Sequence, residues 1–145
     1  MTTIALVVGS VLGTALDVAE QLQEALEAQN YTVVLENGPN SLPQADVYLF
    51  CTSTTGRGNL PSSLTPLVEA IGQHRTEVTG CRYGIVALGD SRYPTFCGAG
   101  RYLDELLSAE GALRIGERLE IDADSADYPD EVALSWLAGW LAALS

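Results

Sequence analysis

Short apolar runs alternate with helical patterns along this chain. The runs consist of β-branched and aliphatic residues at consecutive positions, as is typical of strands buried on both faces of a parallel sheet. They predict strands over residues 4–8, 31–35, 47–51, 83–88 and 115–121. The last run is less apolar than the others, so we expect this strand at an edge of the sheet.

Between these runs, apolar side chains recur at the three- and four-residue spacing of an amphipathic helix. The stripe after the first strand consists of Leu16, Ala19, Leu22 and Leu26. Glutamates occupy the opposite side of this predicted helix. Further helices are predicted near residues 64–73, around residues 102–107 and from Pro129 onward, where proline suits a first helical turn.

Strands that alternate with helices imply right-handed crossovers. The sequence therefore predicts an α/β fold, a doubly wound five-stranded parallel sheet with helices on both faces. No repeat or linker interrupts the pattern, so residues 1–145 are expected to form one domain. In such sheets ligands bind outside the carboxyl ends of the strands. The candidate loops follow the first, third and fourth strands, at residues 9–15, 52–61 and 89–100.

The charge balance is strongly acidic. The chain has 19 acidic and 7 basic residues, a net charge of −12, and every basic residue is arginine. Such a surface repels nucleic acid and anionic membranes, so neither is an expected partner. Two interpretations stay open: the acidic surface attracts a basic protein partner, or it only keeps the protein soluble.

The sequence shows no pattern for membrane insertion, secretion or metal binding. No apolar stretch approaches the ~18 residues that a membrane span needs, and the N-terminus lacks the basic flank of a signal peptide. Cys51, Cys81 and Cys97 lack C-x-x-C spacing, so neither a zinc site nor a disulfide framework is expected. We therefore expect a cytoplasmic protein without a metal site.

Familiar phosphate-binding and catalytic motifs are missing from the candidate loops. The dinucleotide fingerprint needs a glycine where Val11 stands, and the P-loop needs a lysine, which the chain lacks. A phosphorylated receiver would need acids after the first and third strands, where Ser10 and Thr52 stand. The loop after the fourth strand lacks the second glycine of a nucleophile elbow, and the single histidine is His74, on a surface helix. No catalytic residue is predicted.

The three loops instead combine groups that suit a flat, phosphorylated ligand. The first loop offers backbone N–H groups at a helix N-terminus together with the hydroxyls of Ser10 and Thr14, which suit a phosphate. The second loop has two glycines that allow close backbone approach. The third supplies Tyr93 and Phe96, whose rings can stack on a flat group. Together they predict a planar heterocycle that bears one phosphate.

Three segments carry a resemblance to a known family: GSVLGT from Gly9, STTGRGNLP from Ser53 and ALGDSRYPTFCG from Ala87. In this order, each after its own strand, they resemble the flavodoxins, which bind FMN and carry electrons. The resemblance runs from Thr3 to the last helix. It is closest to the short MioC and YqcA type and extends to the FMN domains of diflavin reductases. It implies a flavodoxin-like sheet of strand order 2-1-3-4-5.

The resemblance also implies the cofactor-binding residues, here for a noncovalently bound FMN. The residues expected around the phosphate are Ser10, Val11, Leu12, Gly13, Thr14 and Ala15. Those expected on one side of the isoalloxazine ring are Thr54, Thr55, Gly56 and Arg57. Those expected on the other side are Leu88, Gly89, Asp90, Tyr93, Phe96 and Cys97. Tyr93 stands where these families place a tyrosine that stacks on the flavin.

The function implied is that of a low-potential one-electron carrier, and not of an enzyme. A flavodoxin reductase-type donor and a redox acceptor enzyme would dock on the acidic surface of a monomer. The loops also depart from the family pattern. Leu12 and Ala15 stand at hydroxyl positions of the phosphate loop, and Thr55 stands where many members have an aromatic residue. The alternative is therefore a flavodoxin-fold binding or regulatory module with weak or lost FMN binding.

Arg57 is a further departure, because flavodoxins often carry acids in this loop. A nearby positive charge favours the anionic, fully reduced flavin, so we expect a less negative reduction potential than in strongly acidic flavodoxins. The other interpretation is that Arg57 points to solvent or pairs with Asp90.

Overall fold

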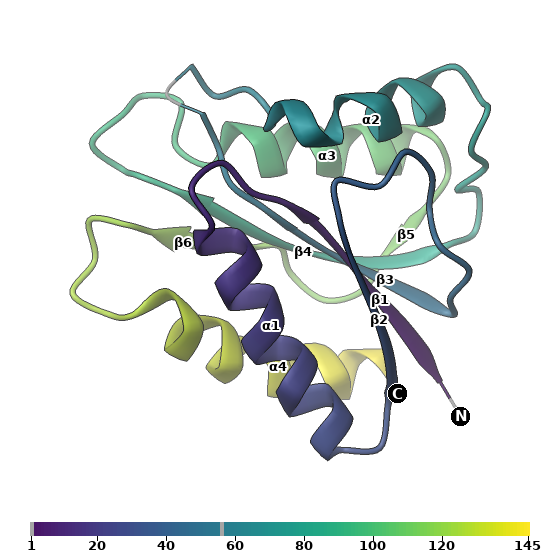
Figure 1. Ribbon diagram of the computed structural model, residues 1–145, viewed down its shortest axis with the longest axis horizontal. Coiled ribbons are helices and arrows are strands. Elements are labelled where there is room, and N and C mark those ends of the chain that lie inside the picture. Colours follow the sequence, from purple (N-terminus) through teal and green to yellow (C-terminus); the bar gives the residue numbers. More distant parts are fainter. Residues whose placement is uncertain (1, 56) are drawn as a thin grey trace.

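The computed structural model describes residues 2–55 and 57–145 of the chain. A parallel sheet lies between two helical layers, with α1 and α4 on one face and α2 and α3 on the other (Figure 1). The strands are β1 (Thr3–Gly9), β2 (Thr32–Asn37), β3 (Val47–Thr52), β4 (Arg82–Gly89), β5 (Leu113–Arg114) and β6 (Leu119–Asp122). The helices are α1 (Thr14–Ala28), the 3₁₀ turn η1 (Ser62–Leu64), α2 (Thr65–Gly72), α3 (Gly98–Ala109) and α4 (Pro129–Leu144).

The strand order is β2-β1-β3-β4-β5, and β6 also pairs with β4. All pairs are parallel. β1 pairs with β2 on one side and with β3 on the other, so the direction of winding reverses at β1 and β3. The predicted α/β class, doubly wound sheet and strand order 2-1-3-4-5 are confirmed, with β5 and β6 sharing the fifth position.

The fifth strand is the element that the sequence predicts incorrectly. The single strand expected over residues 115–121 is two short pieces, β5 and β6, which both pair with β4. Gly116 lies between them at φ 65°, a left-handed conformation that an extended strand cannot contain. The amide of Ile115 still donates to the carbonyl of Tyr83 at 2.7 Å, and residues 116–118 then leave the ladder before β6 begins. Its position at the edge of the sheet is as predicted.

The sheet separates two apolar clusters. Because side chains alternate along a strand, Leu6 of β1 joins the cluster under α1 and α4, whereas Val7 joins the one under α2 and α3. Trp140 of α4 and Leu103 of α3 are buried at the centres of these layers. β1, β3 and β4 are buried along nearly their whole length. This burial explains why their sequences are continuously apolar rather than alternating.

A buried carboxylate on α3 organises the edge of the sheet. Asp104 is only 5% exposed. Its Oδ1 accepts a hydrogen bond from the Tyr83 hydroxyl at 2.6 Å, and its Oδ2 accepts one each from Nη1 of Arg114 and of Arg118, both at 2.6 Å. Burial disfavours the charge, but these donors outweigh it and hold the pKa of Asp104 below its usual range. The carboxylate thus ties α3 to β4, β5 and the segment that leads into β6.

We expect Asp104→Asn to lower the free energy of unfolding by ~3 kcal/mol, because it leaves two arginines without their shared partner. Glu24→Gln on the exposed side of α1 is the matched control and should change stability by less than ~0.5 kcal/mol. Urea denaturation measures both. Equal effects of the two substitutions would show that this carboxylate contributes nothing to stability.

Candidate functional site

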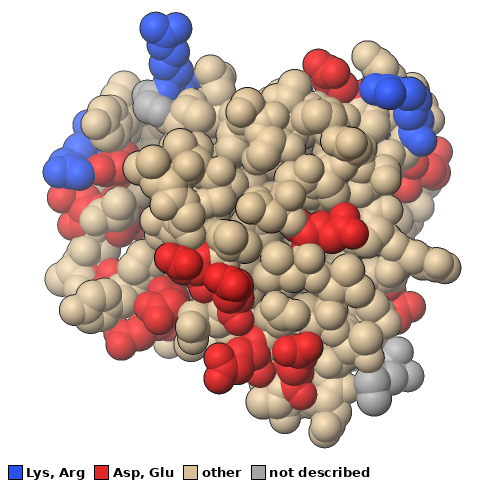
Figure 2. Space-filling view, viewed as in Figure 1, with Lys and Arg blue, Asp and Glu red and all other residues tan. Residues whose placement is uncertain are grey.

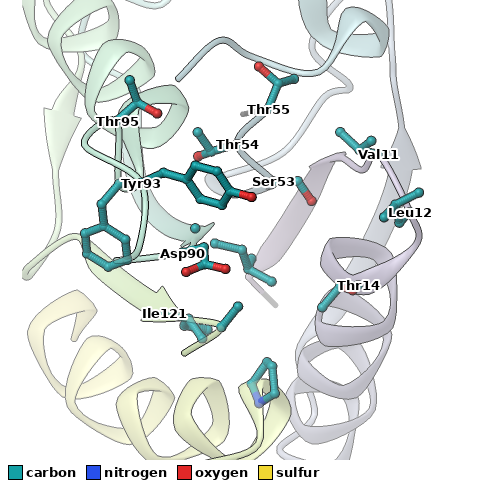
Figure 3. A pocket seen from close by; sticks show the side chains of 15 residues that line it. Val11, Leu12, Thr14, Ser53, Thr54, Thr55, Asp90, Tyr93, Thr95 and Ile121 are labelled. Atoms are coloured by element: carbon teal, nitrogen blue, oxygen red, sulfur yellow. The ribbon is translucent and has the colours of Figure 1, made fainter. Parts of the chain in front are cut away.

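A cavity of about 450 Å³ opens at the carboxyl ends of β1, β3 and β4. The loops that follow these strands form its walls, and Figure 3 shows Tyr93 on one side with Val11 and Leu12 on the other. This is the place where the winding of the sheet reverses, as the strand order requires. Within the described ranges, no cluster of three or more His, Cys, Asp or Glu side chains has the arrangement of a metal site.

Many of the residues expected at the cofactor lie together in this cavity. The predicted residues that line it are Val11, Leu12, Thr14, Thr54, Thr55, Leu88, Gly89, Asp90, Tyr93 and Phe96. They come from all three candidate loops. The sequence therefore locates the walls of the cavity correctly, since the loops converge as a doubly wound sheet demands.

Other expected residues are not part of the lining. Ala15 and Cys97 are fully buried in the apolar clusters. Arg57 is exposed on the second loop. Ser10 and Gly13 lie in the turn between β1 and α1, and Gly56 lies outside the described residues.

The two buried side chains have structural surroundings. The Cys97 thiol donates to the carbonyl of Ala87 at 3.6 Å, and burial raises its pKa to about 12, so it stays protonated at neutral pH. Ala15 faces the core because it lies on the inner side of the first turn of α1. Motif similarity gives the position of these residues in the chain but not the direction of their side chains.

Some lining residues escape the sequence analysis. These are Ser53, Thr95, Ile121, Ala123 and Pro129. The first two are neighbours of predicted residues within the same loops. Ile121 and Ala123 could have been predicted, because ligands bind at the carboxyl ends of parallel strands and the fifth strand ends on the same side of the sheet as the others. The sequence analysis applied this rule only to the first, third and fourth strands. Pro129 carries no local signal, since only the packing of α4 beside α1 brings it here.

The start of α1 lies at one end of the cavity and offers groups that suit an anion. Gly13 is the N-cap residue and makes no side-chain cap, and the first helical hydrogen bond runs from the amide of Asp17 to the carbonyl of Gly13. The amides of Thr14, Ala15 and Leu16 therefore precede the helical ladder and give the helix its positive end. The Ser10 hydroxyl accepts from the amide of Gly13 at 2.8 Å, which leaves its own proton available to a ligand.

Thr54 supplies a second polar feature. Its hydroxyl oxygen is buried and has no hydrogen-bond partner within the described chain. A buried hydroxyl without a partner is unfavourable. Thr54 lies in the cavity lining and is drawn beside Tyr93 in Figure 3, so a polar ligand in the cavity can satisfy it. This unpartnered hydroxyl and the uncapped helix start are what a ring with polar edges and one phosphate requires.

The third loop presents an aromatic side chain on a fixed support. Tyr93 is 53% exposed and faces the cavity. Its amide donates to the carbonyl of Asp90, and the amide of Phe96 donates to the carbonyl of Tyr93. Oδ1 of Asp122, at the end of β6, accepts from the amide of Ser91 at 2.9 Å. These bonds hold the loop against the sheet edge.

Asp90 brings one negative charge to the lining. Its carboxylate accepts hydrogen bonds from the Arg92 side chain and backbone, which lower its pKa to about 2. Among the described residues Asp90 therefore pairs with Arg92, and not with Arg57 as one interpretation of the sequence had it. The second ion-pair partner of Arg92 is Asp124, at 3.7 Å.

The second and third loops touch through their backbones. A Cβ atom at Gly58 would lie 2.7 Å from Cβ of Thr95, and Gly58 has φ 82°. A Cβ atom at Gly98 would lie 2.9 Å from the carbonyl oxygen of Gly58. The two loops that flank the cavity on this side are therefore one continuous wall.

A doubly wound sheet of order 2-1-3-4-5, with a helix start and an exposed tyrosine at its reversal point, is the flavodoxin-like arrangement. The family model described as Flavodoxin matches residues 6–136. The chain is 39% identical to flavodoxin YqcA of Escherichia coli K12, with 100% of both chains covered, and 37% identical to protein MioC of the same organism, with 97% of both covered.

Solved structures agree with these relatives. A cysteine-to-alanine mutant of flavodoxin from Pseudomonas aeruginosa is 35% identical, with 98% of both chains covered and a TM-score of 0.89. Oxidised flavodoxin 1 from Bacillus cereus is 21% identical, covers 99% of this chain and 100% of its own, and supports the fold with a TM-score of 0.85. The chain belongs to the flavodoxin family, and it is of the short MioC- and YqcA-like type. The cofactor of this family is FMN, and its activity is electron transfer.

We expect Gly58→Ala to lower the free energy of unfolding by ~2 kcal/mol, because it adds a Cβ at a left-handed position against Thr95. Gly139→Ala on α4 is the matched control. Nothing lies within 4 Å of its Cβ position, so this helical alanine should raise stability by ~0.5–1 kcal/mol. Urea denaturation measures the change in the free energy of unfolding for both variants. Changes of the same sign would contradict the contact between the loops.

Proposed function

We propose that this protein holds one FMN in the cavity and acts as a low-potential one-electron carrier between a flavodoxin reductase-type donor and a redox acceptor enzyme. The observation that carries the proposal is the convergence of an uncapped helix start and an exposed tyrosine on a cavity of about 450 Å³. No residue acts as a catalytic acid, base or nucleophile. Bound FMN supplies the redox chemistry, and the protein positions and tunes it.

The phosphate is bound chiefly by the backbone. The amides of the first turn of α1 and the hydroxyls of Ser10 and Thr14 are the donors. Leu12 adds none and is 92% exposed. Ala15 points into the core, so the alanine at this hydroxyl position of the family pattern affects packing rather than the phosphate. Two hydroxyls and the amides at the helix end thus replace the larger set of hydroxyl donors in the family pattern.

The ring lies between the loops. Tyr93 stacks on one face, and the Thr54 hydroxyl hydrogen-bonds to a polar edge of the ring. Leu88, Phe96 and Ile121 supply apolar contact at the floor and side. Thr55 offers a small side chain on the second loop, so the opposite ring face has less aromatic cover than in many relatives. These contacts exclude water from most of the ring and leave an edge open to a partner.

The partners are proposed to bind the acidic face. Acidic side chains gather over α1 and α4 in Figure 2. Asp17, Glu20 and Asp130 line a groove of about 320 Å³ between these helices, and Thr14 and Pro129 border both this groove and the cavity. A donor or acceptor with a basic surface is therefore steered toward the flavin edge. Among the described helices, none is long and apolar enough to span a membrane.

The alternative is a flavodoxin-fold binding or regulatory module with weak or lost FMN binding. Leu12 and Thr55 favour it, because both lie at the cavity without the groups that the family pattern places there. Affinity for FMN separates the two functions.

We expect the apoprotein to quench the fluorescence of added FMN with one FMN bound per chain. Leu12→Thr should tighten binding by ~10-fold or more, because a hydrogen bond to a charged phosphate contributes ~1.5–3 kcal/mol. The control Leu113→Thr changes an exposed leucine on β5 and should leave the affinity unchanged. Unquenched FMN would overturn the carrier and support the binding module.

Arg57→Glu should make the reduction potential of the step that forms the fully reduced flavin more negative. The substitution replaces a positive charge, which favours the anionic reduced form, with a negative charge that opposes it. Arg75→Glu, at an exposed position between α2 and β4 and outside the cavity lining, is the control and should shift it little. Spectroelectrochemical titration of the FMN-loaded proteins measures both shifts. Equal shifts in the two variants would show that only net charge matters.

A further inference from the structure

A chain of ion pairs runs from the buried Asp104 toward the cavity. Arg118 donates to Oδ2 of Asp104 at 2.6 Å and, through Nε, to Oε2 of Glu120 at 3.2 Å. Glu120 also accepts two hydrogen bonds from Arg101, at 2.7 Å from Nε and 2.9 Å from Nη2. This two-point geometry fixes the Arg101 guanidinium in one orientation. The chain crosses from α3 to β6 and back to α3.

Arg101 ends this chain on an aromatic ring. Its guanidinium carbon lies 5.7 Å from the centroid of Phe96, within the range of a cation–π contact. Phe96 is half-buried, lines the cavity and also packs on the cluster under α3. Arg101 itself is not in the lining. It therefore covers the outer side of a ring whose inner side faces the ligand.

The turn around Phe96 is held by backbone hydrogen bonds, which include one from the amide of Gly98 to the carbonyl of Thr95 at 2.9 Å, but these bonds do not fix the rotamer of the ring. Cys97, the next residue, is the N-cap of α3 with a left-handed φ of 52° and no side-chain cap. The amide of Phe96 makes a 3.2 Å bond to the carbonyl of Tyr93, and the amide of Arg101 bonds to the carbonyl of Cys97 at 3.1 Å. A ring at such a turn needs side-chain packing to keep its rotamer.

We propose that Arg101 is a positioning residue for the cofactor site: held by Glu120, which Arg118 also pairs with, it keeps the Phe96 ring in the wall of the cavity. This inference rests on the proposed FMN binding. Arg101 reaches the cofactor only through Phe96, so its effect on FMN depends on that ring. A merely structural ion pair between α3 and β6 would change stability without such dependence.

A double-mutant cycle tests this dependence. Arg101→Gln should weaken FMN binding by ~5-fold, as loss of a cation–π contact at a partly exposed site predicts. In the Phe96→Leu background the same change should alter the affinity by less than ~2-fold, because the ring is gone. Arg101→Lys, which keeps the cation over the ring, should restore most of the affinity. Equal losses in both backgrounds would overturn the proposal.

A second measurement uses the apoprotein. Amide hydrogen exchange over residues 93–98 should become faster in Arg101→Gln and stay unchanged in Arg75→Gln, which removes an exposed arginine after α2. Unchanged exchange in Arg101→Gln would overturn the positioning role. If the wild-type protein takes up no FMN, the proposed function fails, whereas the exchange experiment still decides whether Arg101 holds this segment.

Discussion

The placement of β1 between β2 and β3 is the constraint on which the rest of the structure depends. Leu6 of β1 pairs with Leu35 on one side and with Leu49 on the other, so the chain winds away from β1 in both directions. Right-handed crossovers then place α1 and α2 on opposite faces of the sheet. The loops that leave β1 and β3 must diverge, and a cavity results. The strand order creates the site, and the loop residues decide only what it holds.

Charge is distributed unevenly about this frame. Neither α1 nor α4 contains an arginine, so their acids are not neutralised within their own helices. Arg92, Arg101, Arg114 and Arg118 are instead in ion pairs around the third loop, α3 and the edge of the sheet. Basic side chains thus serve mainly to hold one half of the molecule together. The acids of the other half give that face a negative potential, which attracts or repels approaching molecules according to their charge.

The sequence predicts those parts of the fold that depend on local pattern. Strands buried on both faces are continuously apolar, and the loops after them converge by topology, so the walls of the cavity were predictable. The broken fifth strand was not, because Gly116 is one residue in a weak pattern and the ion pairs of Asp104 join distant segments. The directions of Ala15 and Cys97 were also beyond reach, since both depend on how helices pack on the sheet.

The backbone contact between Gly58 and Gly98 has a consequence for how a ligand enters. Loops that touch in this way cannot swing apart as two independent flaps without losing their packing. The open side of the cavity is bordered by Leu12 and Tyr93, both more than half exposed. A molecule that enters on this side passes these two side chains, so their rotamers set the width of the opening while the wall formed by the two loops stays in place.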